Sequence, residues 1–365
     1  MDVKDDKCVF VIFKILDGHC DVSVRTNTIP SKLEMPRLSK PGDFKRHANT
    51  IFLKGRHHFV LQFFWFAVPQ EWFVQELREF IETTKRLKNI SLVCSDYISI
   101  LCFESAQANA AIKTLRVQGS PDFAHMQRVF SFDELRANTG LKTLDVSSSN
   151  LSIANLTNLL TVLTHENRSV KNLSVSENAL HKGHAKQLIR LVSTSTVLRR
   201  LRMEETGVAT KYARRIIEQI RICDRLKEFY ISNDIDCFES LVKLVTRVKN
   251  LRCLSVNGML DTSDNYDKFT EILKTSNESV TTFICTQDQF TNTSFRNVLE
   301  NKHLKRVYLP ALALSLVKIN NLRRANENGR IVFLGDHQPG LFSQVSNRNL
   351  HNAAARKTLL ASLFF

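Results

Sequence analysis

Apolar and polar positions follow a short phrase that recurs along most of the chain. In its clearest copies, which begin at Leu141, Val170 and Leu198, apolar residues occupy places 1, 4, 6 and 11, and a polar residue occupies place 9. Looser copies begin at Leu87, Ile112, Leu226, Leu251, Val280 and Leu304. From residue 112 onward, successive copies start 24 to 29 residues apart. A fixed period of this length indicates stacked structural units.

Each copy of the phrase predicts a short strand. Side chains alternate along a strand, so places 4 and 6 reach a shared core while places 3, 5 and 7 point to the opposite face. We expect parallel strands centred near Leu92, Leu115, Val146, Val175, Met203, Ile231, Val256, Ile284 and Leu309. Place 9 is expected to satisfy backbone groups where the strand turns away. Its polar residues are Ser95, Ser120, Ser149, Asn178, Thr206, Asp234 and Asp288, and Met259 is an exception that predicts a looser turn.

Amphipathic helices are predicted between the strands. They are expected at Ile153–Thr164, Ala185–Ser193, Lys211–Ile222, Phe238–Val248 and Tyr266–Lys274. In the third of these, Ala213, Ile216 and Ile220 recur at helical spacing, with charged residues on the opposite side. A helix is bulkier than a strand, so stacking such units bends the array into a horseshoe. Strands then line the concave face and helices the convex face.

The two ends of the chain do not follow the phrase. Within residues 1–68, Val9–Leu16 and Phe59–Phe66 are predicted as strands. The segment Ile29–Asp43 between them contains three prolines and is predicted to be an irregular loop. A solenoid needs its open ends covered, so we expect residues 1–68 to form an N-terminal cap, residues 69–335 the repeat array, and residues 336–365 a C-terminal cap or tail.

The phrase is the L-x-x-L-x-L-x-x-N-x-L signature, which identifies leucine-rich repeats. The alternation of strand and helix over about residues 70–335 resembles the ribonuclease-inhibitor-like class. That class includes the repeat regions of nucleotide-binding innate immune receptors and of Ran GTPase-activating proteins. The resemblance implies an α/β leucine-rich-repeat solenoid. It also implies a non-catalytic protein that binds a protein partner on its concave face.

Composition and charge further narrow the possible classes of protein. The chain has 51 Lys and Arg against 36 Asp and Glu, a formal net charge of +15. The longest apolar run is about ten residues, well short of the roughly 20 that cross a membrane. No C-x-x-C pair occurs among the eight cysteines, which are expected to be buried free thiols. We expect a cytoplasmic protein, with no membrane among its partners.

Known catalytic and cofactor motifs are not found. The sequence has no phosphate-binding loop, dinucleotide fingerprint, H-E-x-x-H or G-x-S-x-G motif. His181 and His184 are spaced to share one ligand, but no further donors lie nearby in sequence, and we expect both to face solvent. We therefore expect no enzyme activity, no cofactor, no metal site and no small-molecule substrate.

Place 2 of the phrase is basic in eight of the nine copies, and Thr281 is the exception. The eight residues are Lys88, Lys113, Lys142, Lys171, Arg199, Lys227, Arg252 and Lys305. Stacked strands lie ~4.8 Å apart, so these residues are predicted to form a row along the lip of the horseshoe, which we call the cationic rail. One reading is an electrostatic guide for an acidic partner, centred on Lys142, Lys171, Arg199 and Lys227. The other is a solvated position whose lysines promote solubility.

The predicted concave face is small and polar in its first half and carries aromatic residues in its second half. Places 5 and 7 include Ser174 and Ser176 in one repeat, and Arg202, Tyr230 and Tyr308 in later ones. Aromatic residues and arginine dominate binding hot spots, so Arg202, Tyr230 and Tyr308 are the candidate partner-binding residues.

Three functions compete at this stage. The first is a non-catalytic interaction scaffold, acting as a sensor or adaptor in innate immunity or in substrate recruitment for ubiquitin ligation. The second is a GTPase-activating protein for a small GTPase, although that family's functional positions find no match and the chain ends basic rather than acidic. The third is nucleic-acid binding, prompted by the charge but unsupported by any RNA-binding motif. Inhibition of a ribonuclease is disfavoured, because a chain of charge +15 would repel a basic enzyme.

Overall fold

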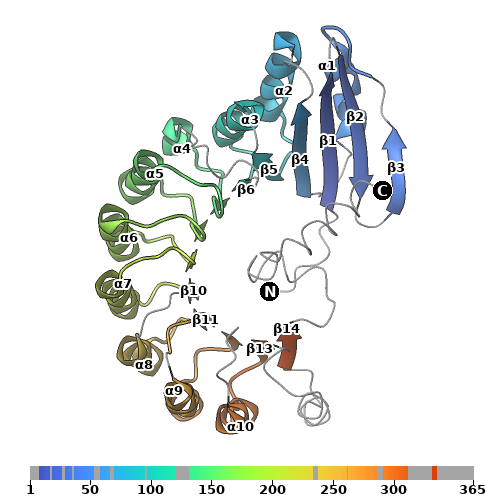
Figure 1. Ribbon diagram of the computed structural model, residues 1–365. Helices are drawn as coiled ribbons and strands as arrows, with labels where there is room; N and C mark the ends of the chain where they lie inside the picture. The colour runs from blue at the N-terminus through green and yellow to red at the C-terminus, as the bar shows by residue number, and fades with distance from the viewer. Residues whose placement is uncertain are drawn as a thin grey trace.

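The computed structural model describes residues 8–16, 19–26, 29–34, 37–52, 58–65, 70–94, 97–119, 131–232, 237–260, 262–285, 291–310 and 331–334. These residues form one curved sheet with helices along its outer side, arranged as a horseshoe (Figure 1). The strand order is β14-β13-β12-β11-β10-β9-β8-β7-β6-β5-β4-β1-β2-β3. From β1 to β14 through β4 all pairings are parallel, and β2 and β3 add antiparallel strands at one end.

The strands are β1 Cys8–Leu16, β2 His19–Thr26, β3 Ile29–Glu34, β4 His58–Trp65, β5 Asn89–Cys94, β6 Thr114–Gly119, β7 Thr143–Asp145, β8 Asn172–Ser174, β9 Arg200–Glu204, β10 Glu228–Ser232, β11 Cys253–Asn257, β12 Thr282–Ile284, β13 Arg306–Pro310 and β14 Ile331–Leu334. The helices are α1 Asp43–Ile51, α2 Glu71–Thr83, α3 Tyr97–Ala108, α4 Asp133–Ala137, α5 Ile153–His165, α6 Lys182–Thr194, α7 Thr210–Cys223, α8 Phe238–Arg247, α9 Ser263–Ser276 and α10 Asn292–Glu300.

The predicted repeat register is confirmed. Leu144 pairs with Leu173, and Leu173 with Leu201, in parallel strands. All three side chains are almost fully buried. The predicted centres Val146 and Val175 lie one residue beyond the ends of β7 and β8. Inter-strand hydrogen bonding continues there, because each of these residues still donates its N–H to a carbonyl of the next strand. The difference is therefore one of strand boundary.

Polar residues at place 9 close the turns after the strands as expected. The hydroxyl of Ser149 donates to the carbonyl of Val117, one repeat earlier, at 2.8 Å. The amide of Asn178 donates to the carbonyl of Val146 at 2.8 Å, and its oxygen accepts from the N–H of Leu151 at 3.1 Å. Met259 has no such group and is fully buried instead. Ser95, Ser120, Asp234 and Asp288 lie outside the described residues.

A second polar ladder, not expected from the sequence, joins the end of a helix to the next strand in five repeats. A buried asparagine stands three residues before place 1 in five repeats: Asn109, Asn138, Asn167, Asn277 and Asn301. In each, the side-chain NH2 donates to a carbonyl of the preceding repeat, and the side-chain oxygen accepts backbone N–H groups that lead into the strand. The recurrence of Asn at one place of the phrase was the available signal.

The N-terminal region differs from its prediction. The segment Ile29–Asp43 was predicted to be an irregular loop, but residues 29–34 form β3, and the unpredicted strand β2 precedes it. β3 is the last strand in the order, and proline is tolerated in edge strands because they pair on one side only. Through the parallel pairing of β1 with β4, this region continues the sheet of the repeats.

An aromatic cluster and one buried carboxylate hold α1 against α2. Phe44 of α1 lies edge-on to Phe73 and Phe80 of α2, with ring centroids 6.0 and 5.7 Å apart. Glu76 of α2 is 8% exposed and accepts hydrogen bonds from the backbone N–H groups of Gly42 at 2.6 Å and Lys45 at 3.3 Å. A helix leaves its first N–H groups without partners, so Glu76 completes the start of α1 from the neighbouring helix.

The five predicted helices are present as α5 to α9, but His184 was predicted wrongly. It is 1% exposed, whereas His181 is exposed as expected. The Nδ1 atom of His184 accepts the N–H of His181 at 3.2 Å, and its Nε2 atom lies 3.0 Å from the carbonyl oxygen of Ile153. The ring therefore closes the start of α6 and links it to α5, a structural role in a buried position.

Candidate functional site

The residues of the cationic rail are joined by a continuous row of backbone hydrogen bonds. The N–H of each place 2 residue donates to the carbonyl of the place 2 residue one repeat earlier, from Lys113 onto Lys88 through to Lys305 onto Thr281, at 2.7 to 2.9 Å. Six of the eight cations are exposed, while Lys142 and Arg199 are half-buried. The strand register thus places the predicted residues side by side, with Thr281 as a gap near one end.

The charges of the rail are not balanced by neighbouring acids. Within the described part of the chain, none of the eight cations forms an ion pair. The ammonium groups of Lys113 and Lys142 instead donate to the carbonyls of Ala110 and Thr139 at 3.1 and 2.8 Å. The pKa of Lys142 is lowered by burial and by the neighbouring charges of Lys171 and Lys113. The rail is therefore a row of mutually repelling cations.

On the concave face, two of the three candidate partner-binding residues are in direct contact. The guanidinium carbon of Arg202, on β9, lies 4.4 Å from the centre of the Tyr230 ring on β10. A guanidinium over an aromatic face is attracted by the electron-rich face of the ring. Both side chains are half-buried, so this stacked pair has a remaining surface on the inside of the curve.

The third candidate, Tyr308, lies in an apolar cluster on the same face. It packs with Cys253 and Ile284, and Tyr230 packs against this cluster. Tyr308 is 9% exposed, so it contributes an edge rather than a whole ring to the surface. The three candidates thus form one strip that runs from β9 to β13.

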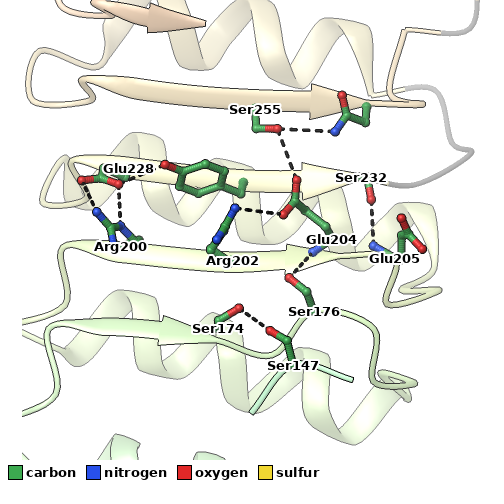
Figure 2. Close-up of polar contacts among 12 residues, drawn as sticks. Ser147, Ser174, Ser176, Arg200, Arg202, Glu204, Glu205, Glu228, Ser232 and Ser255 are labelled. Carbon is green, nitrogen blue, oxygen red and sulfur yellow. Dashed lines mark hydrogen bonds and ion pairs between the residues drawn. The ribbon is translucent and has the colours of Figure 1, made fainter. Parts of the chain in front are cut away.

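A chain of side-chain hydrogen bonds fixes the orientation of Tyr230. Its hydroxyl donates to Glu228 at 3.1 Å and accepts from the thiol of Cys253 at 3.3 Å. Glu228 in turn receives two hydrogen bonds from Arg200, at 2.5 and 2.8 Å (Figure 2). Burial opposes the charge on Glu228, but the hydrogen bonds from Arg200 prevail and lower its pKa. Burial raises the pKa of the Cys253 thiol to about 12, so it is protonated at neutral pH.

Glu204 is a buried carboxyl group beside Arg202. Its exposed fraction is 6%, and one carboxyl oxygen lies 3.7 Å from the Arg202 guanidinium. The other oxygen accepts from the Ser255 hydroxyl at 3.4 Å, so the side chain reaches past β10 to β11 (Figure 2). Burial raises the pKa of Glu204 to about 7, despite the opposing charge of Arg202.

The concave face before β9 carries small hydroxyl groups, as predicted. Ser147 and Ser174 are hydrogen-bonded through their hydroxyls at 2.6 Å, and Ser176 accepts the N–H of Glu204 at 3.0 Å (Figure 2). Place 3 was expected on the concave face, but candidate residues were sought only at places 5 and 7. Arg200, Glu228 and Cys253, which occupy place 3 of three consecutive repeats, were therefore missed, although the alternation of side chains along a strand also brings them to the concave face.

Several further features bear on the chemistry of the described residues. Cys20, Cys102, Cys237, Cys253 and Cys285 are buried thiols outside any disulfide, as expected, whereas the thiol of Cys223 is half-buried. No three or more His, Cys, Asp or Glu side chains of the described ranges are grouped as a metal ion would require. None of the helices described has the length and apolar character of a membrane span.

Comparison with known proteins shows which solved structures have a similar fold. No protein-family model matches the sequence, and a search of curated proteins finds no significant match. Solved structures do match. The leucine-rich repeat-containing protein LegL7 of Legionella pneumophila is 14% identical, with a TM-score of 0.40, over 70% of this chain and 94% of that one. A structure of the Rad7 and Elc1 complex of yeast is 16% identical, with a TM-score of 0.50, over 83% of this chain and 84% of that one.

The repeated phrase, the parallel register and the alternation of strand and helix define the class. The chain is an α/β leucine-rich repeat solenoid.

Proposed function

We propose that this chain is a non-catalytic scaffold of the cytoplasm that binds a protein partner on its concave face. The observation that carries the proposal is the strip formed by Arg202 stacked on Tyr230, beside the cluster that contains Tyr308. Arginine and tyrosine with restrained side chains are the residue types that dominate protein interfaces. Hydrogen bonds that involve Arg200, Glu228 and Cys253 already hold the Tyr230 side chain in place. This side chain therefore loses little conformational freedom on binding.

The position of the strip also supports a protein partner. Solenoids of this kind expose an extended curved surface that suits another macromolecule. The similar yeast structure is itself a complex, of Rad7 with Elc1. The cationic rail borders the strip, so the partner is expected to be acidic and its approach to be guided by the rail.

Affinity capture from the native cell, with the whole chain as bait, tests this proposal. The concave variant combines Arg202→Ala with Tyr230→Ala, and the control combines Lys186→Ala with Arg215→Ala, two exposed cations on the convex helices α6 and α7. Thermal unfolding confirms that both variants are folded. A partner that is kept by the control and lost by the concave variant supports the proposal. Equal capture by the folded concave variant would place the interface elsewhere.

A further inference from the structure

We infer that the cationic rail is a binding track for an extended acidic segment of a polypeptide, laid along the lip of the horseshoe across several repeats. This inference rests on the proposed function, because it assigns a second contact and a chemistry to the same partner. It goes beyond steering, since the rail itself would hold the segment in the complex.

The first argument is the rigidity of the row. Each place 2 backbone is fixed to its neighbours by the continuous hydrogen bonds described above. Five of the nine turns that lead into the row are held by the buried asparagines. Lysines on a stiff, regular support present their charges at a constant spacing, and the backbone has little freedom to lose when a ligand binds.

The second argument is the charge that the row leaves unbalanced. Like charges at neighbouring positions repel, and besides burial the charges of Lys171 and Lys113 on either side lower the pKa of Lys142. The described turns 84–88, 109–113, 138–142, 166–171, 195–199, 224–227, 248–252 and 301–305 all carry net positive charge. The turn 277–281, which holds Thr281 and Glu278, is the one described turn of this edge with net negative charge. An anionic ligand would relieve the repulsion along the row.

The composition of the edge favours an acidic polypeptide over a nucleic acid or a membrane. Six of the eight rail residues are lysines, whose ammonium groups act as point charges for an anionic group. None of the nine described turns contains Phe, Tyr or Trp. Single-stranded nucleic acids are usually held by stacking on such rings, and surface-bound membrane proteins insert them with other apolar side chains.

The dimensions suit an extended chain. From Lys113 to Arg252 the rail crosses five inter-strand steps, which at ~4.8 Å each span ~24 Å. A polypeptide in extended conformation covers that length with about seven residues at ~3.3 Å per residue. A short acidic segment therefore reaches six cations in one pass.

A purely structural role is the alternative that the test must separate. Helices α5 to α10 all end at the rail edge, and cations near helix C-termini offset the negative end of the helix dipole. In that case the rail would matter for stability and not for ligand binding.

The test measures binding of a fluorescent oligoglutamate of about twelve residues to the whole chain by anisotropy, at low and at physiological salt. The rail variant carries Lys142→Glu, Lys171→Glu, Arg199→Glu and Lys227→Glu. The matched control carries Lys186→Glu, Arg215→Glu, Lys243→Glu and Arg296→Glu, four exposed cations on convex helices, so that both have the same net charge. An oligothymidylate and vesicles containing phosphatidylserine are measured in parallel.

We expect oligoglutamate to bind the unmodified chain and the control within about threefold of each other, and the rail variant to bind about tenfold or more weakly. Equal weakening in both variants would show a response to net charge only and overturn the inference. Tighter, rail-dependent binding of the oligonucleotide or the vesicles would also overturn it. A rail variant that loses thermal stability but still binds oligoglutamate would support the dipole role instead. None of these outcomes depends on Arg202 or Tyr230, so failure here leaves the concave proposal standing.

Discussion

Asn167 shows how one side chain can join two repeats. Its NH2 group donates to the carbonyls of Leu135 and Asn138 at 2.7 and 2.9 Å, and its oxygen accepts from the N–H groups of Ser169 and Val170 at 2.9 and 3.1 Å. Asn167→Ala leaves these groups buried without partners, and we expect it to lower the free energy of unfolding by about 2 kcal/mol or more. Urea denaturation measures the change. Asn292→Ala, at an exposed position of α10, is the control and should be close to neutral.

The apolar places of the phrase make a second prediction. Leu173 and Leu201 are 1% and 0% exposed and pair with each other in neighbouring strands. We expect Leu173→Ala or Leu201→Ala to destabilise the chain by roughly 2–5 kcal/mol, the range for truncating a buried leucine. Unchanged denaturation midpoints in both variants would contradict the register seen here.

Glu204 makes the stability depend on pH. Its pKa is about 7 in the folded chain, against 4.5 for the free side chain, so the folded state binds more protons between these values. Stability should therefore fall as pH rises from about 4.5 to about 7 and stay reduced above that. Besides Arg202 and Ser255, the acids Glu205 and Glu177 act on this carboxyl group.

Glu204→Gln removes this titration. We expect the variant to be more stable than the unmodified chain at pH 8, by up to about 3 kcal/mol, and to show a flatter stability profile between pH 4.5 and 7. Thermal or urea unfolding across this range measures both effects. A variant that is less stable at pH 8 would mean that the Arg202 ion pair outweighs the burial of the charge.

At the scale of the elements, the backbones of neighbouring turns on the rail edge are closely packed. A Cβ atom added to Gly140 would lie 1.8 Å from the carbonyl oxygen of Ala110 in the preceding turn. Gly140→Ala must therefore separate two turns, and we expect a loss of about 2 kcal/mol or more in unfolding free energy. Gly183 of α6 has nothing within 4 Å of the same position, so Gly183→Ala should be neutral or stabilising by up to about 1 kcal/mol. Similar effects of the two changes would be inconsistent with this packing.

The elements also show what the sequence could reveal. The strands and helices of the repeats were predictable because the apolar places recur with one period and one register. The rail was predictable for the same reason, since place 2 is shared. β3 was missed because prolines usually interrupt strands, and only its place at the edge of the sheet makes Pro30 acceptable.

The contacts of the concave site were predictable in part. Arg202 and Tyr230 occupy the same place of adjacent repeats, so their stacking follows from the register. The contact of Glu204 with Ser255 does not follow from the register. The two residues lie on β9 and β11, with β10 between them, and the contact depends on the conformation of the long, buried Glu204 side chain. Sequence periodicity defines neighbours along the sheet but not how far a side chain reaches across it.

Across the whole molecule, the asparagine ladder has a direction. In all five repeats that contain it, the NH2 group donates backwards, to a carbonyl of the preceding repeat. During synthesis on the ribosome, the acceptor of every such bond has already emerged when its donor appears. Each repeat can therefore pack against a preceding repeat that is already folded, before the rest of the chain has been synthesised. Stalled nascent chains of increasing length should gain protease resistance in steps of one repeat, beginning at the N-terminus. Resistance that appears only at full length would show that the array forms in a single late event.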